Sequence, residues 1–191
     1  MAMATSSPTL GALLLLALFS AAGVHGAAPS SPLDQLCGSL GSFYVTPELC
    51  ASTLCVDASS CRSARGAPEL AALATRLAAA NATAAKASIE SALALDAERV
   101  PAPASAADAD ARKGMRSCLQ LYAGAVPALR WAARSVAAGR YSGAREVLDA
   151  AQYVASGCAG MAGEATLPKE NDRFSSMAIV AHAIVASMSA T

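Results

Sequence analysis

Cysteine and histidine are the residue types in this chain most able to do chemistry, and the sequence holds six cysteines but only two histidines. A structural zinc site normally uses Cys-x-x-Cys pairs or several histidines, and this sequence has neither pattern. An even number of cysteines without a metal pattern instead favours disulfides and an oxidising compartment. We therefore expect no metal and no cofactor, and we assign all the cysteines to disulfides: Cys37, Cys50, Cys55, Cys61, Cys118 and Cys158.

Catalytic residues are not expected in this sequence. A Ser-His-Asp or Cys-His hydrolase needs a histidine base. The one histidine beyond the N-terminal segment, His182, lies in the apolar stretch 177–188, where we interpret it as core or surface filler. Paired carboxylates could hydrolyse glycosides, but none lies among the glycines and aromatic residues that shape a sugar cleft. The sequence therefore predicts a protein that is not an enzyme.

The N-terminal segment has the pattern of a cleaved secretion signal. Residues 10–22 are apolar apart from Gly11 and Ser20, and small residues occupy the −3 and −1 positions before Ala27. A membrane anchor would need about 20 apolar residues, which is longer than this run. We expect cleavage after Gly26, which leaves residues 27–191 as a single secreted domain.

The charges exclude two classes of partner. Fourteen basic and fourteen acidic residues cancel, and no long block of one sign appears in the sequence. Nucleic acids and anionic membranes attract strongly basic proteins, so neither is an expected partner.

Helices must position these residues, because alanine-rich segments with helical periodicity alternate with proline and glycine. Residues 27–65 are broken by Gly38, Gly41 and Pro47 into short pieces, which indicates a helical hairpin. A long helix is expected over 67–98 and should end before Pro101. Its apolar face is predicted to hold Leu70, Leu73, Leu77, Ala84, Ile89 and Leu93.

Three further helices are expected over 106–138, 142–160 and 168–188. Pro127 should bend or locally break the first of them, and Gly139 should stop it. Cys118 and Cys158 fall on the apolar stripes of consecutive helices. Short connections favour antiparallel neighbours. The predicted fold is therefore all-α: an up-down-up-down four-helix bundle over 66–191, preceded by the hairpin over 27–65 and stapled by disulfides.

The chain resembles the plant invertase/pectin methylesterase inhibitor family across essentially its whole mature length. No single motif carries the likeness; the order and spacing of several motifs do. These are Cys37 with Tyr44-Val45-Thr46-Pro47-Glu48-Leu49-Cys50, then Cys118-Leu119-Gln120-Leu121-Tyr122, then Leu148-Asp149-Ala150-Ala151 leading to Cys158.

The resemblance implies a role and a set of cross-links. It implies a protein that inhibits a carbohydrate-active wall enzyme, and the disulfides Cys37–Cys50 and Cys118–Cys158. Without it, six cysteines allow fifteen pairings. Cys55 and Cys61 are additional to the family pattern, and we expect them to form a third bridge. Asn81-Ala82-Thr83 is an acceptor sequence for N-glycosylation.

The target enzyme depends on one short segment. Inhibitors of invertase in this family resemble one another in a Pro-Lys-Phe tripeptide near the start of the helix that ends at the fourth cysteine. Here the segment 139–143 has no such tripeptide, so pectin methylesterase is the expected partner. Invertase is the alternative target, and an apoplastic helical protein without an enzyme target is a further one.

The residues expected to touch the partner are Trp131, Arg140 and Tyr141, since aromatic residues and arginine dominate binding energy at interfaces. Packing of Trp131 beneath the N-terminal hairpin is the alternative for that residue. We expect the free protein to be monomeric.

Overall fold

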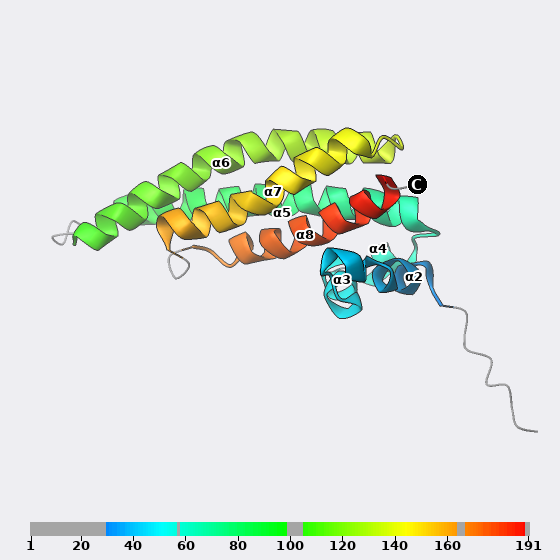
Figure 1. Cartoon of the computed structure of the whole chain (residues 1–191). Coiled ribbons are helices and arrows are strands. Elements are labelled where there is room, and N and C mark those ends of the chain that lie inside the picture. The colour runs from blue at the N-terminus through cyan, green and yellow to red at the C-terminus, as the bar shows by residue number, and fades with distance from the viewer. Residues whose placement is uncertain (1–29, 57, 99–104, 164–166, 190–191) are drawn as a thin grey trace, which may run out of the picture. The chain divides into compact units, whose positions relative to one another are not determined.

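In the computed structural model, residues 30–56, 58–98, 105–163 and 167–189 are described. Every element within these residues is a helix and none is a strand, as the sequence predicts (Figure 1). The predicted signal peptide and the segment around Pro101 lie outside the described residues.

The hairpin consists of short helices, two of which have a side-chain cap at the N-terminus, and it contains two disulfides. Its elements are α2 (Pro32–Gly38), the 3-10 helix η1 (Leu40–Phe43), α3 (Pro47–Leu54) and α4 (Ala58–Arg62). The Ser31 hydroxyl accepts from the Asp34 N–H at the start of α2, and the Thr46 hydroxyl accepts from the Leu49 N–H at the start of α3.

The disulfides Cys37–Cys50 and Cys55–Cys61 are both formed, which confirms these two pairings. The first links α2 to α3, and the second links the residue after α3 to α4. A hairpin this short has little apolar core of its own, so cross-links of this kind hold it together.

Four long helices form the bundle: α5 (Ala67–Glu98), α6 (Ala106–Ala137), α7 (Ser142–Ala162) and α8 (Glu170–Ser189). The main packing partners of α5 are α6 and α8, and those of α7 are the same two helices. The hairpin packs on α5 and α8. Each expected helix is confirmed, with its ends within two residues of the predicted positions.

The core face of α5 differs from the prediction. Leu70, Leu73 and Ile89 are buried as expected, and Leu77 and Leu93 are half-buried, but Ala84 is exposed. The buried stripe of α5 consists mainly of small residues: Ala71, Ala74, Ala78, Ala82 and Ala85. Because α5 packs on two helices, it needs a broad face, and alanines allow the helix axes to approach closely.

Inside α6, Pro127 does not break the helix, which continues from Ala106 to Ala137. The side chain of Pro127 is exposed. The predicted local break is absent. Helix α6 packs against α5 and α7, and these contacts hold its turns in place.

A buried polar connection joins three of the bundle helices. The Tyr122 hydroxyl on α6 donates to Oδ1 of Asn171 at 2.8 Å, and Nδ2 of Asn171 on α8 donates to the Ala155 carbonyl of α7 at 3.3 Å. The ring of Tyr122 also meets Phe174 of α8 edge to face, with centroids 5.3 Å apart. Because hydrogen bonds are directional, these two bonds fix the register of α8 against α6 and α7.

Candidate functional site at the turn between α6 and α7

A four-residue turn, 138–141, joins α6 to α7. Gly139 adopts a φ of 74°, which agrees with its predicted role in ending α6. The N–H of Gly139 donates to the Val136 carbonyl and that of Arg140 to the Ser135 carbonyl, both at 2.9 Å. These hydrogen bonds hold Arg140 and Tyr141 at the end of the helix pair.

Trp131 lies against the first turn of α7. A Cβ atom at Gly143 would be 3.0 Å from Cη2 of the Trp131 ring, so glycine leaves the space that the indole occupies. The Trp131 side chain remains 45% exposed. The alternative position beneath the hairpin is wrong, because Trp131 packs on α7 whereas the hairpin packs on α5 and α8.

The structure therefore brings the three predicted partner residues to one end of the α6–α7 pair, which we call the corner (Trp131, Arg140 and Tyr141). Their roles differ. Arg140 is exposed, whereas Tyr141 is half-buried and packs against the core. The Tyr141 carbonyl also accepts from the Arg145 N–H at 2.8 Å. Arg140 and the outer part of Trp131 are thus the groups available to a partner.

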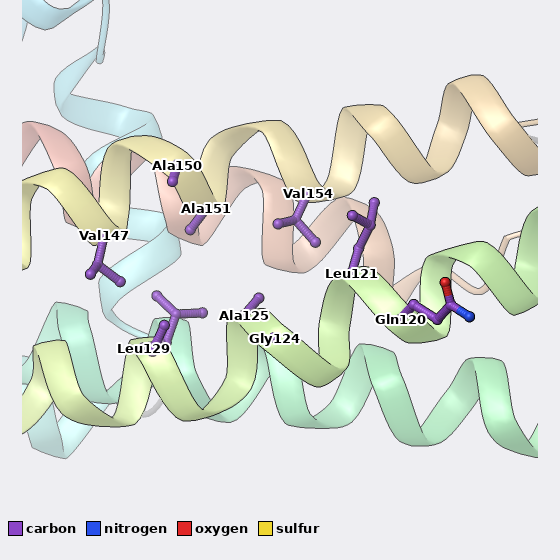
Figure 2. A pocket seen from close by; sticks show the side chains of 10 residues that line it. Gln120, Leu121, Gly124, Ala125, Leu129, Val147, Ala150, Ala151 and Val154 are labelled. Atoms are coloured by element: carbon purple, nitrogen blue, oxygen red, sulfur yellow. The ribbon is translucent and has the colours of Figure 1, made fainter.

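An apolar groove of about 380 Å³ runs between α6 and α7 (Figure 2). Leu121 and Val154 lie toward one end and Leu129 and Val147 toward the other. Small residues line its middle, where the sequence has Gly124-Ala125 and Ala150-Ala151. Helical periodicity does not reveal this groove, although two pairs of small residues at matching places in neighbouring helices are a signal for it.

Cys118 and Cys158 lie side by side in the core, as the sequence predicts, but they are thiols in this structure. Burial is the largest cause that raises the pKa of both thiols, and each thiol also affects the pKa of the other. The expected disulfide between them is therefore not formed in this structure. The two cysteines nevertheless bring α6 and α7 face to face, as predicted. The cross-link between these two cysteines stays a prediction.

The corner, the groove and all six cysteines lie within residues 31–184, which match a protein-family model. The sequence profile of the plant invertase/pectin methylesterase inhibitor family matches residues 31–184. The chain belongs to this family. The match includes the hairpin and almost the whole bundle, so the resemblance seen in the sequence is confirmed. No curated protein and no solved structure matches the chain.

Members of the plant invertase/pectin methylesterase inhibitor family are inhibitor proteins and are typically extracellular. No helix among the described residues is long and apolar enough to cross a membrane. In the same part of the chain, no group of three or more His, Cys, Asp or Glu side chains is arranged to hold a metal ion.

Asn81, the predicted glycosylation site, and His182 both lie on bundle helices. Asn81 lies in the middle of α5 and is half-buried, and the Thr83 hydroxyl donates to the Ala79 carbonyl at 2.8 Å. Glycosylation of Asn81 remains a prediction. His182 is half-buried on α8, with Nε2 3.8 Å from Oδ1 of Asp149 on α7.

Proposed function

We propose that this chain is a secreted inhibitor of pectin methylesterase that blocks the pectin-binding cleft of the enzyme in a one-to-one complex. The observation that carries the proposal is the composition of the corner. Invertase inhibitors of the family resemble one another in having Pro-Lys-Phe at this position. This chain instead has Arg140 and Tyr141 in the turn, beside Trp131. The proposed inhibitor is one domain, residues 27–191, released into the apoplast after removal of residues 1–26.

The proposed mechanism is steric. A stable protein complex buries about 1,600 Å² in total, and a few aromatic and arginine side chains supply most of its binding energy. At the corner, Arg140 can pair with a carboxylate of the enzyme and Trp131 can bury its outer face. The groove beside the corner can receive an apolar side chain of the enzyme. Since cleft and inhibitor meet over this area, pectin cannot bind at the same time.

A titration of the mature protein against both enzymes tests the assignment. We expect stoichiometric inhibition of a plant pectin methylesterase, competitive with pectin, and no effect on invertase at the same concentration. Inhibition of invertase with an unaffected methylesterase would establish the alternative target. Inactivity toward both enzymes would favour a protein without an enzyme target.

Variants at the corner test the interface. Trp131→Ala and Arg140→Ala should each weaken inhibition by about thirtyfold, which corresponds to about 2 kcal/mol for an anchor residue. Tyr44→Ala is the matched control, since Tyr44 is 95% exposed on the hairpin. Melting temperatures of the variants must be measured alongside, because Trp131 also packs on Gly143. Equal effects of Tyr44→Ala and the corner variants would place the interface elsewhere.

A further inference from the structure

The net charge of zero conceals a one-sided distribution along the chain. Half of the basic residues, and none of the acidic ones, fall between residues 111 and 145. The seven cations are spread too widely in sequence to form a run of like charge. They are Arg112, Lys113, Arg116, Arg130, Arg134, Arg140 and Arg145.

Helix α6 gathers three of these arginines on one side. At 3.6 residues per turn, Arg116, Arg130 and Arg134 point in nearly the same direction from the helix axis, and all three are exposed. The exposed residues between them on that side are uncharged: Gln120, Ala123 and Pro127. With a rise of about 1.5 Å per residue, the row extends over about 27 Å. Arg140 is exposed in the turn that follows α6. We call these four arginines the arginine row.

The arginine row is not neutralised within the described residues. Arg112 pairs with Asp96 at 3.5 Å and Arg145 pairs with Glu146 at 2.8 Å, so nearby carboxylates already serve these two cations. In the described part of the chain, no carboxylate forms an ion pair with Arg116, Arg130, Arg134 or Arg140. Arg130 and Arg134, one helical turn apart, repel each other. A polyanion bound along the row would relieve this repulsion.

The chemistry of the row indicates which polyanion. The guanidinium group binds carboxylates through two parallel hydrogen bonds, and the extended row suits a linear chain that carries many of them. Trp131, next to Arg130, adds a half-exposed apolar ring on which the C–H face of a sugar can pack. Hydrolysis of a methyl ester of pectin releases methanol and leaves one carboxylate on that sugar, which stays in the polymer. De-esterified pectin is therefore a polysaccharide with the required charge.

We propose that the arginine row binds de-esterified pectin. The ligand lies along α6, with its carboxylates on the four arginines and one sugar against Trp131. This binding uses Trp131 and Arg140, which the proposed inhibition also uses, but it is measured without the enzyme, so failure of one proposal is distinguishable from failure of the other. It would retain the inhibitor where pectin has already lost its methyl groups.

The test measures binding of the mature protein, residues 27–191, to polygalacturonate and to highly methyl-esterified pectin by calorimetry. We expect the protein to bind polygalacturonate and not the methyl-esterified pectin, and we expect added salt to weaken this binding. Arg130→Gln combined with Arg134→Gln should weaken binding by about tenfold, since two exposed ion pairs are lost. Arg62→Gln combined with Arg76→Gln removes the same charge from exposed positions on α4 and α5 and should change binding by less than about twofold.

Three results would overturn the proposal. Equal losses in the two double variants would show attraction by overall charge rather than by the arginine row. Equal affinity for esterified pectin would exclude the carboxylates as the recognised groups. No binding to either polymer would leave the row to an acidic protein surface. Circular dichroism of each variant separates loss of binding from loss of fold.

Discussion

Tyr122 shows how one hydroxyl group can hold three helices in place. Its pKa is raised by burial first, and then by the neighbouring thiols and Asp172, so the phenol stays neutral and acts as a donor. Tyr122→Phe removes the donor and leaves Oδ1 of Asn171 without its partner. We expect the free energy of unfolding to fall by about 1–3 kcal/mol, measured by urea denaturation. Tyr153→Phe is the control, since Tyr153 is 69% exposed, and an equal loss there would contradict this role.

The paired thiols of Cys118 and Cys158 give a second prediction for single residues. In protein made in an oxidising compartment, we expect peptide mapping to find them joined. The raised pKa of both thiols slows oxidation once they are buried, so the bond should form before packing is complete. Cys118→Ser should then cost about 4 kcal/mol and Cys55→Ser about 2 kcal/mol, because the first bridge closes the longer loop. Calorimetry showing equal or reversed losses would mean that local packing outweighs loop closure.

Among the elements, α6 and α7 cross closely at Gly114. A Cβ atom there would lie 2.2 Å from the Met161 carbonyl oxygen, so Gly114→Ala must push the helices apart. We expect a loss of about 2 kcal/mol or more in thermal unfolding. Gly124→Ala on the same helix meets nothing within 4 Å and should stabilise α6 by up to about 1 kcal/mol. A stabilising Gly114→Ala would contradict the close crossing.

The sequence predicts where the helices begin and end better than it predicts which of their faces are buried. Prolines and glycines punctuate the chain, and residues such as Gly139 and Pro47 place helix ends with little ambiguity. Alanine gives no such signal, because it suits both a core and a surface. Periodicity therefore predicts Ala84 in the core of α5 although it is exposed, and it does not reveal the groove beside Gly124. Trp131 was one of the three residues expected at the site, but its packing on Gly143 depends on how α6 meets α7, which periodicity does not encode.

In the whole molecule, the hairpin and the surface proposed for inhibition belong to different helices. The hairpin packs on α5 and α8, whereas the corner is built by α6 and α7. Replacing both cysteines of the bridge Cys55–Cys61 with serine should lower the melting temperature and leave inhibition of pectin methylesterase within about twofold, because the corner is unchanged. Inhibition assays well below the melting temperature check this. A parallel loss of inhibition would mean that the hairpin takes part in the interface.

Trp131 is the only tryptophan in the sequence and is half-exposed at the corner. Ultraviolet emission excited selectively from tryptophan therefore originates at one place in the folded protein, the place where Arg140 and the end of the arginine row lie. A partner that covers the indole would shift its emission to shorter wavelengths, whereas a partner on the hairpin would leave the spectrum unchanged. The chain thus carries a built-in optical reporter of the surface on which both proposals depend.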